Sequence, residues 1–359
     1  MKNFIILLLG FTLLILSQSC REDEIQDETE ITIPDPDTGI VTSVSGIITD
    51  ENNEPLNAVT LQLGTDMTSS DENGHFIFQE VIVNSNGSQI SVEKSGFFDT
   101  YKFVFPELNT PSHLRIELIT KEKVGEFVAN QTGNITFGEA SIDFEADAII
   151  DSNGNPYQST VIVYSHWYDP TDNDLVFSMP GDLRGADLDG NDVQLSTYGM
   201  MAVELETPGG EKLQIAEGKT ATLSFPIPTE IAGDAPNEIP LWFFEESTGK
   251  WMEEGFAVKN GNAYVGEVAH FSFWNCDVPN DFIKLSGQVN LKSGPAVNYQ
   301  LIVKNTSNLA SATSSTNLSG RFCGWVPNDA ELVLTIIGRC GDVIPVSYTH
   351  LTLPTICSV

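Results

Sequence analysis

Positively charged side chains are scarce in this 359-residue sequence, which holds 17 lysines and arginines against 50 aspartates and glutamates. The formal net charge of −33 repels nucleic acid and anionic lipid headgroups, so we exclude both as partners. Recognisable catalytic motifs are also missing: no G-x-S-x-G, H-E-x-x-H, Walker loop or dinucleotide fingerprint occurs. The enzyme classes that depend on those motifs are therefore excluded.

Helical periodicity is the next feature that the sequence lacks. After the first 20 residues no stretch keeps a 3.6-residue apolar period over several turns. Short segments of alternating apolar and polar residues take its place, separated by turns rich in Gly, Asn, Asp and Thr. This pattern predicts an all-β protein made of tandem antiparallel β-sandwich domains.

The N-terminus has an apolar run, residues 4–16, that is too short to span a bilayer, which takes about 20 residues. It follows one basic residue and precedes the sequence Ser-Gln-Ser-Cys, which ends at Cys20. This ending resembles the lipobox of bacterial lipoproteins, although Ser17 stands where that motif prefers Leu. The resemblance implies that residues 1–19 are a signal peptide and that Cys20 is acylated. An ordinary signal peptide with an incidental cysteine is the alternative.

An acidic tract follows the cysteine. Residues 20–41 carry eight acids and one base, so self-repelling charge and few apolar side chains predict a disordered tether. Its first acids, Glu22, Asp23 and Glu24, resemble the export signal of lipoproteins that reach the outer cell surface. We therefore expect an outer-membrane protein, anchored by lipid and facing the exterior. A solvated spacer inside the periplasm is the alternative.

The first domain is predicted at 42–118. A V-S-G strand at 44–46, a D-x-x-x-x-P-L turn at 50–56 and an alternating strand come first, followed by a D-E-N-G turn at 71–74 and an F-x-F strand. This order resembles the carboxypeptidase regulatory-like domain. The resemblance implies a seven-stranded transthyretin-like or immunoglobulin-like sandwich with a folding, spacing or binding role. It implies no peptidase activity.

The central region, 121–279, begins at a short joint, 121–123, and has strand patterns throughout. Two motifs, at 197–203 and at 241–255, resemble the extracellular region of cartilage intermediate layer protein. The match covers about 190–275 and carries no assigned chemistry. The length of the region allows two packed subdomains. Seven aromatic residues could form a carbohydrate-stacking platform, but their alternation favours a buried core: Trp242, Phe243, Phe244, Trp251, Phe271, Phe273 and Trp274.

The third domain, predicted at 282–345, repeats the first. Residues 285–287 match 44–46, 295–303 match 55–63, 313–315 match 68–70 and 320–322 match 74–76, at offsets of 240 to 246. The tail, 346–359, resembles a translated transposase adapter from sequencing-library preparation. We expect it to be non-native and the third sandwich to be truncated. A native terminal strand is the alternative.

Two acidic loops are candidates for a structural calcium site, because calcium takes 6–8 oxygen ligands. The candidate ligands are Asp169, Asp172 and Asp174 in one loop and Asp187, Asp189 and Asp192 in the other. Counting twelve residues from Asp187 reaches Tyr198 rather than Glu, so the EF-hand spacing is absent. Solvated turns are the alternative.

The five cysteines are an odd number. Cys20 is assigned to lipid, and Cys357 lies in the adapter-like tail. The other three, Cys276, Cys323 and Cys340, allow one disulfide and one free thiol in an oxidising compartment. Their spacing does not choose the pair.

Taken together, these features predict a lipid-anchored surface protein with a non-catalytic role in binding, adhesion or display. Its partner would be an extracellular glycan or protein ligand. The alternative is a surface enzyme or accessory subunit that acts on glycan or peptide. No cofactor is expected apart from the calcium ion considered above.

Overall fold

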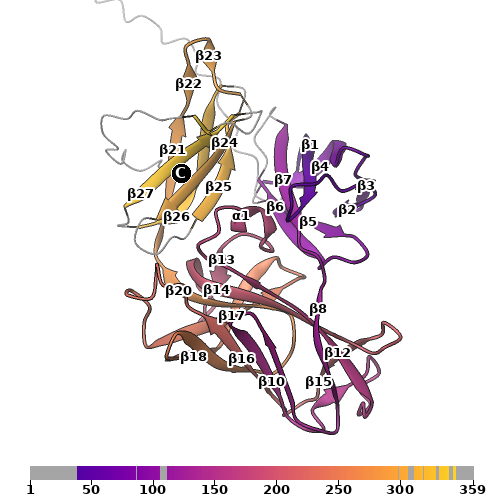
Figure 1. Ribbon diagram of the computed structural model, residues 1–359. Helices are drawn as coiled ribbons and strands as arrows, with labels where there is room; N and C mark the ends of the chain where they lie inside the picture. The colour runs from indigo at the N-terminus through magenta and orange to yellow at the C-terminus, as the bar shows by residue number, and fades with distance from the viewer. Residues whose placement is uncertain are drawn as a thin grey trace, which may run out of the picture.

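A computed structural model describes residues 39–344 apart from positions 86, 106–110, 298, 306–310, 318, 329–330 and 339–342. Three β-rich bodies follow one another along this part of the chain (Figure 1), with one short helix, α1 (Leu175–Ser178), in the second. The predicted all-β fold class is confirmed. None of the helices in these described residues is long and apolar enough to cross a membrane.

The first body is a sandwich of a three-stranded sheet, ordered β4-β1-β7, and a four-stranded sheet, ordered β3-β2-β5-β6. Its inward-facing side chains alternate along the strands and form a core of their own, which includes Val44, Leu61 and Phe78. One pairing departs from the expected antiparallel arrangement, because β1 and β7 are parallel. The strands are β1 (Gly39–Asp50), β2 (Thr60–Leu63), β3 (Asp66–Ser69), β4 (His75–Asn84), β5 (Ser88–Glu93), β6 (Thr100–Val104) and β7 (Ser112–Leu118).

The turn before β4 depends on a glycine. Gly74 has φ of +75°, in the left-handed region, as the D-E-N-G turn predicted. A Cβ atom built there would lie 2.3 Å from the backbone oxygen of Ile48. That oxygen is close because Ile48 N–H donates a 2.9 Å hydrogen bond to Gly74 O. The glycine is therefore required by both conformation and space.

We expect Gly74→Ala to lower the free energy of unfolding by about 2 kcal/mol or more, since it combines left-handed strain with a backbone clash. The matched control is Gly64→Ala, where φ is +59° and nothing lies within 4 Å of the added Cβ. That control should cost about 1 kcal/mol. Urea denaturation of both variants measures the difference, and equal costs would contradict the clash.

The second body is a 13-stranded sheet that curls over a large core. Its longest path runs β11-β15-β14-β20-β17-β18-β19-β16-β10-β9, and β8, β12 and β13 join at its sides. The strands are β8 (Lys123–Val128), β9 (Gly133–Phe137), β10 (Ala140–Phe144), β11 (Ile149–Ile150), β12 (Thr160–Tyr168), β13 (Arg184–Ala186), β14 (Asp192–Glu206), β15 (Lys212–Ile215), β16 (Ala221–Pro226), β17 (Glu238–Glu245), β18 (Lys250–Asn260), β19 (Ala263–Val268) and β20 (Phe273–Asn280).

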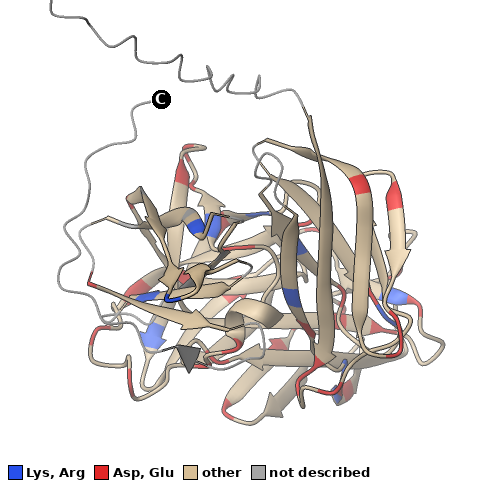
Figure 2. Ribbon diagram, turned by 90° about the horizontal axis from the view of Figure 1, so that it is seen from above, with Lys and Arg blue, Asp and Glu red and all other residues tan. Residues whose placement is uncertain are grey.

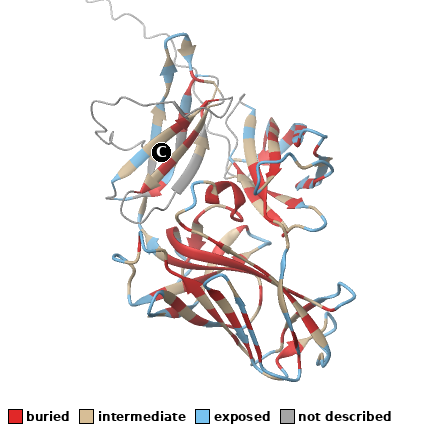
Figure 3. Cartoon of the chain, in the orientation of Figure 1, coloured by how far each residue is buried: buried red, intermediate tan, exposed pale blue. Residues whose placement is uncertain are grey.

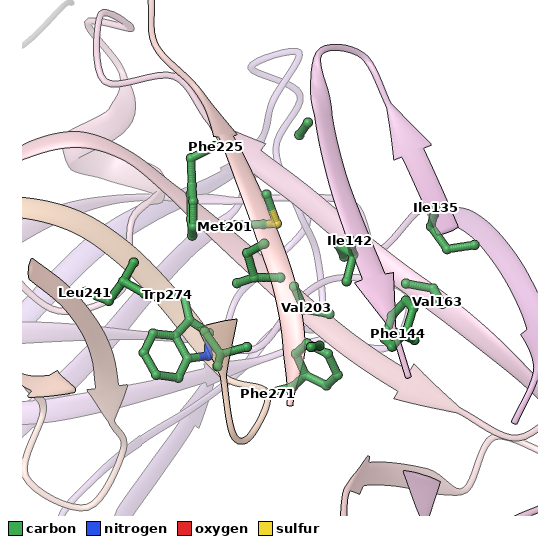
Figure 4. Packing of buried hydrophobic residues seen from close by; sticks show 14 of the residues in the cluster. Ile135, Ile142, Phe144, Val163, Met201, Val203, Phe225, Leu241, Phe271 and Trp274 are labelled. Carbon is green, nitrogen blue, oxygen red and sulfur yellow. The ribbon is translucent and has the colours of Figure 1, made fainter. Parts of the chain in front are cut away.

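Strand β14 is buried on both faces over most of its length (Figure 3). Met201 and Val203 point into the main core beside Trp274 (Figure 4). Met200 and Ala202, which alternate with them, belong to a second hydrophobic cluster on the opposite face. The sequence of a strand that is covered on both faces is typically a nearly continuous run of apolar residues. The buried part of β14 has this pattern.

The N-terminal and C-terminal halves of the central region pack against each other. Side chains from 124–180, such as Ile142 and Phe144, pack in the same cluster as Leu241 and Trp274 (Figure 4). The N-terminal strands β9 and β10 also extend the sheet beyond β16 through the β10–β16 pairing. Both halves of the region therefore share one core.

The third body contains the remaining strands, and its core includes Leu301, Phe322 and Ile336. In Figure 1 it lies beside the first body, with α1 in contact with both β7 and β25. The strands are β21 (Phe282–Gln288), β22 (Asn290–Leu291), β23 (Gly294–Pro295), β24 (Gln300–Asn305), β25 (Ser311–Ser315), β26 (Arg321–Pro327), β27 (Leu332–Ile337) and β28 (Val343–Ile344).

The first and third bodies repeat the same hydrogen bonds. Val289 N–H donates to Gly320 O at 2.7 Å, as Ile48 N–H donates to Gly74 O. Gly320 has φ of +72°, and its added Cβ would lie 2.4 Å from the Val289 oxygen. The internal repeat therefore extends to the strained turn itself.

At one position, the structural match between the first and third bodies differs by one residue from the match that their sequences give. Ser70 Oγ accepts the N–H of Val59 at 2.9 Å in the first body. In the third body Thr316 Oγ1 accepts the N–H of Tyr299 at 2.9 Å. Thr316, rather than Ser315, is thus the structural counterpart of Ser70. In both bodies a side-chain hydroxyl accepts the backbone N–H of a residue in the neighbouring segment.

Candidate binding cleft

The first sandwich is joined to the central body by a shared hydrophobic cluster. Phe98 and Ile119 of the sandwich are 2% and 6% exposed, and they pack in one cluster with Met200, Trp242 and Phe273 of the central body. Trp242 and Trp251 have no exposed surface, so the predicted buried core is confirmed for them. The two bodies therefore meet over a packed apolar interface.

Polar and aromatic contacts hold the same interface at its edge. Gly181 N–H donates to the oxygen of Tyr101 at 2.6 Å, and the Tyr101 ring stacks on Phe244 with centroids 5.4 Å apart. The amide of Gln89 donates to the oxygen of Glu246 at 2.8 Å. These contacts fix the orientation of the sandwich relative to the central sheet.

A buried lysine lies within this interface. Lys102 of β6 is 6% exposed, and its ammonium donates to the backbone oxygen of Met179. Burial lowers the pKa of Lys102 to about 7, although Glu117 and Asp182 act in the opposite direction. Burial also raises the pKa of Glu117 to about 7. The interface therefore includes charged groups that are largely withdrawn from water.

Two cavities open beside the interface, between the sandwich and the central body. The first has a volume of about 550 Å³ and is lined by residues 93–97 of the sandwich together with Lys121 and Tyr164. The second has a volume of about 300 Å³. Asp99, Glu204 and Lys212 line both cavities. We call the two cavities together the interdomain cleft.

Lys121 organises the polar wall of the cleft. Its ammonium donates to Glu204 Oε2 at 2.7 Å and to Glu206 Oε1 at 2.5 Å. It also lies 4.9 Å from the ring centroid of Tyr164, a cation–π distance. Burial alone would lower the pKa of Lys121, but its hydrogen bonds with the two carboxylates raise it. The lysine and both glutamates thus form a fixed charged group.

Lys212 makes only weak ion pairs with the carboxylates that the two cavities share. Its Nζ lies 4.0 Å from Asp99 Oδ2 and 3.9 Å from Glu204 Oε2, and its side chain is 69% exposed. Burial raises the pKa of Asp99, against the effect of Lys212 and with further contributions from Glu204 and Glu93. Asp99 is therefore a partly desolvated carboxylate with an incompletely compensated charge.

The sequence patterns did not identify this cleft. The sequence predicts only a short joint at Lys121, and no pattern distinguishes Asp99, Glu204 or Lys212. One signal was present: Glu204 and Glu206 are two residues apart on a strand whose intervening Leu205 enters the core. Residues two apart share one face, so both acids had to point away from the core, near the joint.

The acidic loop at 187–192 is closed by its own side chains. Asp187 Oδ2 accepts the side-chain amide of Asn191 at 3.0 Å, and its Oδ1 accepts the N–H groups of Asn191 at 2.7 Å and Asp189 at 3.0 Å. These bonds, the side-chain bond from Asn191 most of all, lower the pKa of Asp187. Asp192 pairs with Lys250 at 2.6 Å. The same pair of hydrogen bonds, from the N–H groups two and four residues later to Oδ1, occurs at Asp50, Asp71 and Asp151. This aspartate cap is therefore a recurrent feature of the turns.

The loop at 169–174 likewise uses its acids locally. Asp169 Oδ1 accepts the N–H of Thr171 at 2.8 Å, and Asp172 Oδ1 accepts the N–H of Asp174 at 2.9 Å. Asp174 lies 3.7 Å from the Arg115 guanidinium. In the described ranges no group of three or more His, Cys, Asp or Glu side chains could hold a metal ion. The structure thus does not bring the six calcium candidates together.

Cys276 is a free thiol, which the expectation of one disulfide and one free thiol among three cysteines allows. It is free and fully buried, in the middle of β20 opposite Leu241 of β17. Burial raises the pKa of its thiol well above the ordinary value. Its neighbours in the sheet interior are apolar side chains, so Cys276 is not a disulfide partner.

The remaining predicted site residues lie where the structure makes no statement about their side chains. Cys20, Glu22, Asp23 and Glu24 precede the described residues, and the tail 346–359 follows them. Cys340 also falls outside, and only the backbone of Cys323 is described, in β26. Acylation, export and a disulfide between these two cysteines stay predictions.

Solved structures with some likeness to this chain include two pilins. The major pilin subunit of Bacillus cereus aligns with 84% of this chain and 91% of its own, at 12% identity and a TM-score of 0.18. The major pilin SpaD of Corynebacterium diphtheriae aligns with 83% of this chain and 86% of its own, at 10% identity and a TM-score of 0.20.

Sequence comparison finds more specific relatives. No family model matches the chain. Human cartilage intermediate layer protein 2 is 29% identical over 229 residues, which are 57% of this chain and 19% of that protein. Human cartilage intermediate layer protein 1 is 25% identical over 270 residues, 67% of this chain and 22% of that protein. The chain thus spans about a fifth of the length of these curated relatives. The similarity to cartilage intermediate layer proteins that the two central motifs indicated is confirmed at this level of identity.

Proposed function

We propose that this is a lipid-anchored, non-catalytic binding protein of the outer cell surface that holds an extracellular ligand in the interdomain cleft. The observation that carries the proposal is the pair of cavities that share Asp99, Glu204 and Lys212 beside a packed interface. Ligand sites are concave, largely preformed and often located between domains. A rigid interface loses little conformational entropy when a ligand binds.

The chemistry of the cleft favours binding over catalysis. Glu204 and Glu206 are both held by the Lys121 ammonium at 2.5 to 2.7 Å, so the pair is arranged as a fixed charged group. A glycosidase needs one carboxyl that gives a proton and a second that attacks or activates water. Two carboxylates that share one ammonium fix charge and hydrogen-bond geometry, which is what a recognition surface requires.

Binding is tested with glycan and extracellular-matrix arrays, run beside a hydrolase panel. We expect a ligand whose affinity changes at least tenfold in Lys212→Met, a variant that keeps the fold because the side chain is 69% exposed. The matched control is Lys219→Met, whose ammonium pairs with Glu145 at 3.2 Å on the surface outside the cleft. Turnover that is abolished by Glu204→Gln would contradict a non-catalytic role, and equal effects of the two lysine variants would contradict the site.

The anchor is tested separately. Intact-mass analysis of the membrane fraction should show a chain that begins at Cys20 with a lipid adduct. Replacing Glu22, Asp23 and Glu24 by Ala should keep the adduct but remove protease accessibility on whole cells. An unmodified chain in the medium would contradict the anchor, and unchanged accessibility would contradict the export signal.

A further inference from the structure

We propose that the second cavity of the interdomain cleft binds the free amino terminus of a peptide whose first residue is apolar. This inference rests on the proposed function, because it names the ligand of the same cleft. It goes further in assigning the ammonium to the carboxylates at the mouth and the first side chain to the apolar interior.

Seven of the fifteen residues that line the second cavity are apolar. Among them, Phe98 comes from the sandwich, Leu205 and Leu213 come from β14 and β15, and Phe271 and Phe273 lie just before and at the start of β20. Its volume of about 300 Å³ equals on the order of ten water molecules at about 30 Å³ each. Releasing such water from apolar walls favours an apolar side chain as the occupant.

The mouth of the cavity carries an excess of negative charge. Asp99, Asp151, Glu204 and Glu246 line it, with Lys212 as the only amine among the lining residues that the structure describes. Over the whole cleft, six carboxylates face three lysine ammonium groups. Acidic residues outnumber basic ones elsewhere along the chain too (Figure 2), but here they line a cavity together with apolar residues.

Asp99 is the best-placed partner for an ammonium. Its nearest cation is Lys212, at 4.0 Å, beyond hydrogen-bond distance and on a mostly exposed side chain. Burial raises the pKa of Asp99, so its ionised form is poorly compensated in the free protein. A ligand ammonium within hydrogen-bond distance would supply the missing charge.

The first cavity continues the site along the peptide. It meets the second at Asp99, Glu204 and Lys212, so a chain whose first residue fills the second cavity can extend past Lys212 into the first. There the hydroxyl of Thr60 and the charged group around Lys121 offer donors and acceptors for a peptide backbone. A neutral glycan would use such groups but would leave the excess negative charge at the mouth without a partner.

The test uses a peptide array in which each of the twenty residues stands first, with the amino terminus either free or acetylated, and the full mature chain as the probe. We expect free peptides with Leu, Ile, Phe or Met first to bind at least tenfold more strongly than their acetylated forms. Fluorescence anisotropy with the best peptide should show a loss of tenfold or more in Asp99→Asn. Glu246→Gln, an exposed position, provides a second variant that does not endanger folding.

Glu145→Gln is the matched control, since it removes an exposed carboxylate outside the cleft. Equal binding of acetylated peptides, no preference for apolar first residues, or no binding at millimolar peptide would each overturn the inference. If a glycan binds instead and Lys212→Met abolishes that binding, this inference fails while the proposed function stands. If neither class of ligand binds, both fail.

Discussion

Phe98→Ala is expected to separate the first sandwich from the central body. Phe98 is 2% exposed and packs in the cluster that the two bodies share. Truncating a buried phenylalanine typically lowers the free energy of unfolding by about 3–5 kcal/mol. Here the lost contacts are those between the two bodies. Differential scanning calorimetry should therefore resolve two transitions where the wild type shows more cooperative unfolding. The variant should also lose ligand, because its cleft walls are no longer held together.

The control is Phe78→Ala, which truncates an equally buried phenylalanine in the sandwich's own core. It should destabilise the sandwich without exposing the joint. Trypsin distinguishes the two, because Lys121 and Lys123 are the lysines of the joint. We expect rapid cleavage there in Phe98→Ala, leaving two folded fragments, and digestion of the sandwich itself in Phe78→Ala. If Phe98→Ala unfolds in a single transition and its joint resists trypsin as in the wild type, the interface contributes little to the coupling between the two bodies.

How far the sequence could predict this architecture depends on the range of the interactions involved. The turn at Gly74 was predictable, because a tight turn with positive φ is specified by a few adjacent residues. The buried positions of Trp242 and Trp251 followed from alternation, which records which face of a strand is covered. Both are local patterns, and both were confirmed.

The interdomain cleft depends on contacts that are far apart in the sequence. Asp99 and Lys212 are brought to 4.0 Å only by the docking of one domain on another. No local sequence pattern shows that Phe98 leaves its own sandwich for the neighbouring cluster. The calcium candidates illustrate the converse: acidic residues close together in the sequence suggested a metal site as one possibility, whereas Asp187 caps its own turn.

A buried polar network in the central sheet gives a further large expected effect. Asp277 of β20 has no exposed surface, and its Oδ2 accepts a 2.5 Å hydrogen bond from the amide of Asn275. Its other oxygen, Oδ1, has no hydrogen-bond partner among the described residues. Burial raises the pKa of Asp277 well above its usual range, with a smaller opposing effect from the Thr197 side chain. The carboxyl therefore stays protonated in the folded state to higher pH than in the unfolded chain.

This difference sets the direction of the pH dependence. Above the unfolded pKa, about 3.9, the folded state binds more protons at Asp277 than the unfolded state, so stability falls as pH rises towards the folded pKa. Each pH unit in that window costs about 1.4 kcal/mol. Asp277→Asn removes the titrating group while keeping an oxygen for the Asn275 amide. Relative to wild type, the variant should gain stability as the pH rises above the unfolded pKa, as measured by urea denaturation at several pH values. As a control, Asp66→Asn, at an exposed position in β3, should show the same dependence of unfolding free energy on pH as the wild type. Parallel curves of unfolding free energy against pH for the wild type and Asp277→Asn would contradict the protonated carboxyl.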